Sequence, residues 1–195
     1  MKELKTLINL IDFVGHPAVN ELYTTQKRFD TLDRLLYKNN KLKDKVIISH
    51  VPNLNKNQLE YSTWAERLIE VKEKVVKKYN ATWIDMIEST DVIEVTQLLH
   101  KNNYIIKPGL TQIIFGGTNL SGCILNKKEV SVKSFVDLGF DCTIYLPMCT
   151  ECDQVGVNDL EKTWIAINKI YDYVVKNNIT HKVSLISEER DLMLK

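Results

Sequence analysis

The stretch Thr111-Gln-Ile-Ile-Phe-Gly-Gly-Thr-Asn-Leu-Ser-Gly-Cys-Ile-Leu125 carries the clearest structural signal in the chain. Its first part is apolar and β-branched, which predicts a buried strand. The chain then passes through Gly116 and Gly117 into the expected first turn of a helix at Cys123. Backbone N–H groups and the helix dipole at such a place favour a thiolate, so Cys123 is a candidate nucleophile. The alternative is a small buried thiol that packs at a strand–helix junction.

Short apolar runs and helical patterns alternate along the whole sequence. The runs are nearly continuous in apolar residues, which suits strands covered on both faces, and they lie at 7–13, 46–51, 82–87, 112–115, 142–146 and 183–186. Helical patterns lie at 20–38, 58–79, 91–103, 123–138 and 158–178. This alternation predicts an α/β fold with a mostly parallel six-stranded sheet between helices.

Two details of the helices can be tested against a structure. Gly139 is expected to end the fourth helix in the left-handed conformation. The last helix has an apolar stripe with helical spacing, formed by Leu160, Trp164, Ile167, Tyr171 and Val174. The tryptophans at 64, 83 and 164 are expected in the core or at a subunit contact.

Composition narrows the class of protein. A length of 195 residues suits one domain, 1–195, and the 44% hydrophobic and 26% charged content is that of an ordinary globular protein. The net charge is +1 with both signs interspersed, so nucleic acid is not an expected partner. No apolar run approaches the roughly 20 residues that span a bilayer, so no membrane partner is expected. The four cysteines do not form a disulfide framework, which favours a reduced, cytoplasmic location.

In a parallel sheet, ligands bind beyond the carboxyl ends of the strands. Asp12 follows the first predicted strand, His50 ends the second and Glu88 follows the third. We expect His50, Glu88 and Asn119 to face a small-molecule substrate. For His50 a hydrogen-bonded structural role is the alternative, and for Asp12 a turn-forming role.

Three segments resemble the isochorismatase-like cysteine hydrolases. They are the strand that ends in Ile11-Asp12, the element Gly117-Thr-Asn-Leu-Ser-Gly-Cys123-Ile124, and Val136-Asp-Leu-Gly139-Phe140-Asp-Cys-Thr-Ile-Tyr145. The resemblance implies a three-layer α/β/α fold, hydrolysis of an amide-like C–N bond or of a vinyl ether, an Asp–Lys–Cys triad, no cofactor and a homo-oligomer. Carried over to this sequence, Cys123 is the nucleophile and Asp12 the base. Backbone N–H groups of Gly122 and Cys123 form the oxyanion hole.

The chain also departs from the family pattern. The family's lysine follows the third strand, where this sequence reads Glu88-Ser-Thr, and neither Lys78 nor Lys107 stands at the matching place. Leu120 replaces a threonine, and the helix after Cys123 looks about one turn longer. Only His50 stands where nicotinamidases of the family carry a metal-binding set, so no metal is expected. The missing lysine supports an alternative function, a catalytically inactive member kept as a structural or interaction subunit.

Two more motifs remain open. Cys149-Thr-Glu-Cys152 has the spacing of a metal or redox pair, although the thiols of a loop show the same pattern. The segment from Gly116 to Gly122 is a candidate anion-binding loop at a helix start.

Overall fold

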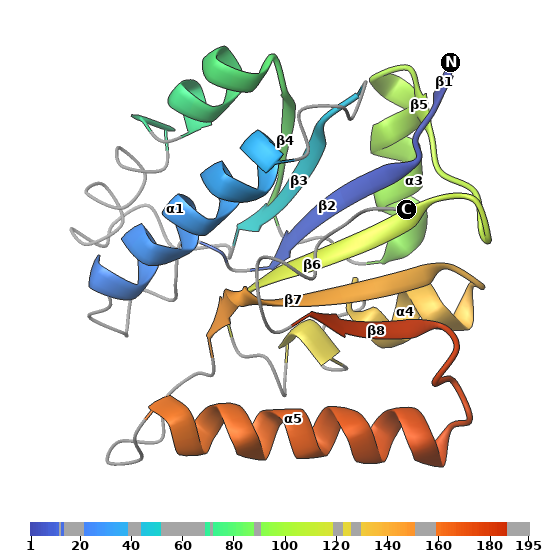
Figure 1. Cartoon of the computed structure of the whole chain (residues 1–195). Coiled ribbons are helices and arrows are strands. Elements are labelled where there is room, and N and C mark those ends of the chain that lie inside the picture. Colours follow the sequence, from blue (N-terminus) through green and yellow to red (C-terminus); the bar gives the residue numbers. More distant parts are fainter. Residues whose placement is uncertain are drawn as a thin grey trace.

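A computed structural model describes residues 1–11, 13, 22–38, 44–51, 69–70, 72–87, 91–118, 123–125, 130–150 and 159–186. Six parallel strands form the central sheet, in the spatial order β4-β3-β2-β6-β7-β8 (Figure 1). They are β2 (Thr6–Ile11), β3 (Val46–Val51), β4 (Thr82–Ile87), β6 (Gln112–Thr118), β7 (Asp141–Thr150) and β8 (Val183–Ile186). The two-residue strands β1 (Lys2–Glu3) and β5 (Tyr104–Ile105) form a separate parallel pair. The predicted six-stranded sheet is therefore confirmed.

Helices cover both faces of this sheet. On one face, Phe29, Leu32 and Leu36 of α1 (Leu22–Lys38) and Val75 of the helical residues 72–79 pack on Ile8, Leu10 and Ile47. On the other face, α3 (Val92–Lys101), α4 (Val132–Asp137) and α5 (Asp159–Lys176) pack on Leu7, Ile48, Ile113 and Ile144. Successive residues of a strand point to opposite faces, so the buried strands supply both cores. The three-layer α/β/α prediction is confirmed.

The ends of the helices follow local rules. Asp91 caps α3, because its side chain accepts a hydrogen bond of 2.8 Å from the backbone N–H of Glu94. Gly139 has φ +88° after α4, as predicted.

The predicted helix over 123–138 is wrong. Residues 123–125 are helical, and α4 begins only at Val132. Ser131 has an extended backbone, with φ −77° and ψ 173°, so no single helix runs through this position. Cys123 is therefore not the first residue of a long helix.

Candidate active site

The carboxyl ends of β2, β3 and β6 lie side by side. We call this end of the parallel sheet the rim. Ile11 of β2 pairs with His50 of β3 on one side and with Gly117 of β6 on the other. Gly117 has φ +134°, and a Cβ atom there would lie 1.8 Å from the carbonyl oxygen of Ile11. The two strand ends can approach this closely only because position 117 has no side chain.

Strand β7 reaches the rim through a bulge. Phe115 of β6 pairs with Ile144 of β7. The next pair joins Gly117, two residues further along β6, to Cys149, five residues further along β7. A Cβ atom at Gly116 would lie 2.9 Å from the Cβ atom of Met148, a residue within the bulge. Gly116 and Gly117 thus belong to β6 and are buried against neighbouring strands. At these two positions the proposed anion-binding loop is replaced by strand.

Cys123 is a partly exposed thiol beside the core. The next two residues, Ile124 and Leu125, are buried, while Cys123 packs against the core cluster on the side of α3, α4 and α5. It forms no disulfide. Because the extended backbone of Ser131 ends any helix before α4, Cys123 does not have the dipole of the predicted helix over 123–138.

Several predicted site residues lie outside the described residues: Asp12, Glu88, Asn119 and Gly122. The proximity of the Asp12 carboxylate to the Cys123 sulfur therefore stays a prediction, as does the oxyanion hole.

His50 lies in a buried polar network. Its side chain points to the face of α3 and α4, and the residue is only 5% exposed. Its Nε2 lies 2.6 Å from Oδ1 of Asn9, and Nδ2 of Asn9 donates a hydrogen bond of 3.1 Å to the carbonyl oxygen of Val130. The amide nitrogen of Asn9 donates to Val130, so the Oδ1 atom that faces His50 is an acceptor. Nε2 of His50 therefore carries the proton of this hydrogen bond, and in a neutral ring Nδ1 is then the acceptor nitrogen. The structural interpretation of His50 is the one that this geometry supports.

The sequence-based prediction missed Asn9. It is fully buried in the middle of β2, flanked by Ile8 and Leu10. An amide within an apolar strand is a signal in itself, since a buried polar group is costly without partners. Asn9 ties the segment that follows Cys123 to the central strand, because Val130 lies between the 123–125 turn and α4.

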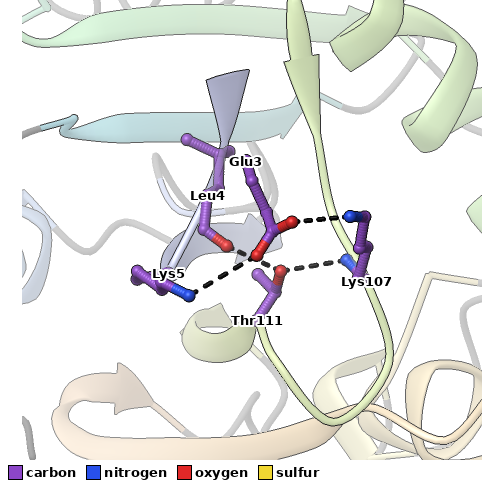
Figure 2. Close-up of polar contacts among 5 residues, drawn as sticks. All are labelled: Glu3, Leu4, Lys5, Lys107 and Thr111. Atoms are coloured by element: carbon purple, nitrogen blue, oxygen red, sulfur yellow. Dashed lines mark hydrogen bonds and ion pairs between the residues drawn. The ribbon is translucent and has the colours of Figure 1, made fainter. Parts of the chain in front are cut away.

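The two lysines considered for the triad are engaged elsewhere. Nζ of Lys107 lies 2.6 Å from Oε2 of Glu3, next to the bonds that Thr111 makes to Leu4 and Lys107 (Figure 2). These residues precede β2 and β6, so they lie at the amino ends of the strands, opposite the rim. Lys78 pairs with Asp33 of α1 at 2.8 Å. Neither lysine lies at the rim.

Acidic and thiol groups elsewhere have structural partners. Asp85 of β4 accepts a hydrogen bond of 2.9 Å from the Trp83 indole and pairs with Lys72. The Cys149 thiol donates to the carbonyl oxygen of Tyr145 at 3.2 Å. Burial raises the pKa of the Cys142 thiol far above its ordinary value, and the charge of Asp141 adds to this effect. Cys152 lies outside the described residues, so the Cys149–Cys152 motif stays untested.

Two kinds of feature are absent from the described residues. In that part of the chain, no three His, Cys, Asp or Glu side chains gather in a way that could hold a metal ion. Within the same residues, no helix is both long and apolar enough to cross a membrane.

Comparison with known proteins identifies the architecture. No protein-family model matches the sequence, and no curated protein matches it. The structure is similar to the crystal structure of a nicotinamidase from Staphylococcus aureus, with a TM-score of 0.55, 12% sequence identity, and coverage of 95% of this chain and 99% of that one. It is also similar to an isochorismatase family protein, with a TM-score of 0.52, 13% identity, and coverage of 94% and 98%. The chain therefore has the isochorismatase-like fold that the three short sequence segments implied.

Proposed function

We propose that this protein is an isochorismatase-like cysteine hydrolase that cleaves the C–N bond of a small amide, with Cys123 as nucleophile and Asp12 as base. The observation that carries the proposal is the pairing of Ile11 with Gly117. This pairing brings together the ends of the two strands that lead to Asp12 and to Cys123. Similarity to a nicotinamidase over nearly the full length of both chains supports the same class of reaction.

The chemistry needs two steps. The Cys123 sulfur attacks the amide carbonyl while a carboxylate takes up the thiol proton, and donors near the turn stabilise the oxyanion. The C–N bond then breaks, the amine leaves with that proton, and a thioester remains on Cys123. Water attacks the thioester, which releases the carboxylic acid and restores the thiol.

Ammonia release from a panel of small primary amides tests the proposal. We expect Cys123→Ala and Asp12→Asn to abolish release, whereas Cys149→Ala keeps it and serves as the matched thiol control. Mass spectrometry after rapid acid quenching is expected to find the acyl group on Cys123 alone. Release that persists in Cys123→Ala would refute the assignment.

A second function, an inactive fold kept as a subunit, is favoured by two observations. Lys78 and Lys107 are engaged away from the rim, and Cys123 lacks a long helix to stabilise its thiolate. Alkylation by iodoacetamide across pH separates the two functions. An active site predicts that Cys123 reacts faster than free cysteine at neutral pH, and an inactive fold predicts an equal or slower rate.

A further inference from the structure

The side-chain amide of Asn9 has one orientation that satisfies both of its neighbours. Nε2 of His50 donates to Oδ1 at 2.6 Å, and Nδ2 donates to the carbonyl oxygen of Val130 at 3.1 Å. Rotation of the amide by half a turn would set two donors against each other at His50 and two acceptors against each other at Val130. His50 on β3 therefore fixes the direction in which β2 presents this donor.

Val130 belongs to the stretch of chain that carries Cys123. It follows Cys123 by seven residues and directly precedes Ser131, the N-cap of α4. Ile124, Leu125 and Val130 are all buried in the core cluster on the side of α3, α4 and α5, against which Cys123 also packs. A carbonyl that precedes the N-cap lies outside the hydrogen-bond ladder of the helix, so when buried it needs a partner from elsewhere. The Asn9 side chain is such a partner.

This polar contact crosses a layer that is otherwise apolar. Asn9 shares its face of β2 with Leu7 and Ile11. Its neighbours in register are Ile48 of β3 and Phe115 of β6, both buried. An apolar side chain at position 9 would suit such a layer, whereas a buried amide is costly unless its partners are in place. A fully paired polar group of this kind selects one arrangement of the segments that it joins.

We propose that Asn9 and His50 are positioning residues that hold the segment carrying Cys123 where its thiol reacts. Both act through the carbonyl of Val130, so neither side chain needs to touch the substrate in this role. The extended backbone of Ser131 excludes a single helix that would hold the thiol by its own hydrogen bonds, and the bond from Asn9 ties the segment to the central strand instead. The inference rests on the proposed function, since the place of the thiol affects a rate only if Cys123 is the nucleophile.

Steady-state kinetics of the full chain, with the primary amide that the wild type hydrolyses fastest, measure the effect on catalysis. His50→Leu and Asn9→Leu should each lower kcat at least about ten-fold, because a misplacement of ~1 Å can cost ~100-fold. KM should change by less than about three-fold, since the place of the nucleophile acts on the transition state rather than on substrate binding. His50→Gln, whose amide can still donate to Asn9, should restore most of the wild-type kcat.

Val75→Ala separates positioning from stability. Val75 is 4% exposed and belongs to the core cluster on the opposite face of the sheet, so its truncation destabilises the domain without touching Asn9 or His50. It should lower the midpoint of urea unfolding about as far as His50→Leu does. Its kcat should nevertheless stay within about two-fold of the wild type, because distant sites act independently.

Alkylation of Cys123 by iodoacetamide tests the positioning without a substrate. Loss of the bond to Val130 should loosen the segment from the core, so the Cys123 thiolate of His50→Leu and Asn9→Leu should react at least about three-fold faster than in the wild type. Rates measured across pH give the value for the thiolate, and peptide mapping by mass spectrometry assigns the label to Cys123. His50→Gln and Val75→Ala should keep the wild-type rate.

Slower hydrolysis together with faster alkylation is the pattern expected of a displaced nucleophile. An alkylation rate in both leucine variants equal to that of Val75→Ala overturns the inference, whatever happens to kcat. A wild type that hydrolyses no amide, with faster alkylation in both leucine variants, refutes the proposed hydrolase and supports the positioning of Cys123. The two conclusions are therefore tested separately.

Discussion

Replacing Asn9 by leucine should cost this protein a large part of its stability, although the two side chains have the same number of heavy atoms and the same branching. Asn9 is fully buried and joins His50 to the carbonyl of Val130. Leucine leaves the Nε2–H of His50 and the oxygen of Val130 without this partner, and each such buried group costs ~1–3 kcal/mol. Burial of the leucine offsets ~1–2 kcal/mol. The expected loss is about 3 kcal/mol, out of ~5–15 kcal/mol for a typical domain.

Urea unfolding followed by circular dichroism measures this loss. With a slope near 2 kcal/mol per M, the midpoint should fall by about 1.5 M at an unchanged slope. His50→Gln is the conservative control, because its amide can still donate to Asn9, and it should cost less than ~1 kcal/mol. His50→Leu should cost about 2 kcal/mol.

Coupling between Asn9 and His50 gives the decisive result. The double variant Asn9→Leu/His50→Leu should be about 1 kcal/mol more stable than the sum of the two single effects predicts, because the second change removes the donor that the first leaves unpaired. A loss below ~0.5 kcal/mol for Asn9→Leu, or strict additivity in the double variant, would refute the network.

Three further results are expected. Gly117→Ala should lower the free energy of unfolding by more than ~4 kcal/mol, because the new Cβ atom would collide with a β2 carbonyl. Gly109 has φ +72° and nothing within 4 Å of the position of a Cβ atom, so Gly109→Ala should cost only ~1–2 kcal/mol. Thermal unfolding measures both losses. The raised pKa of Cys142 means that above about pH 9 the unfolded chain loses a proton that the folded chain keeps. Stability should then fall by up to ~1.4 kcal/mol per pH unit, a slope that Cys142→Ala removes in urea titrations at pH 9 and 10. Lys107→Met should leave ammonia release unchanged, and a loss there would contradict its placement away from the rim.

The fold was predictable because most of its strands are short, nearly continuous apolar runs, which are a local pattern in the sequence. The bounds of β3, β4 and β8 agree with the predicted 46–51, 82–87 and 183–186. The prediction ended two other strands too early: β6 continues through glycines, which weaken a strand signal, and β7 continues through Pro147, which the bulge accommodates. The helix after Cys123 failed for another reason. Apolar residues spaced for a helix occur on both sides of Ser131, and periodicity alone does not reveal its extended backbone.

The candidate site was predictable only in part. Cys123 follows from a local motif, and the structure places it partly exposed beside the core. The partnership of Asn9 with His50 depends on the parallel register of β2 and β3 and on a backbone carbonyl 121 residues away from Asn9. Contacts between distant parts of the chain produce no periodic pattern in the sequence. The polar residue within an apolar strand is the only local sign of them.

The close approach of Gly117 to Ile11 has a mechanical consequence. With a neighbouring carbonyl where a side chain would stand, β2 and β6 cannot slide or part at their ends without breaking their hydrogen bonds. Any cavity above them therefore has a base of paired backbone, and its size depends on the residues that follow these strands. A substrate of a different shape would require changes in the residues that follow the strands, while the paired strand ends stay the same.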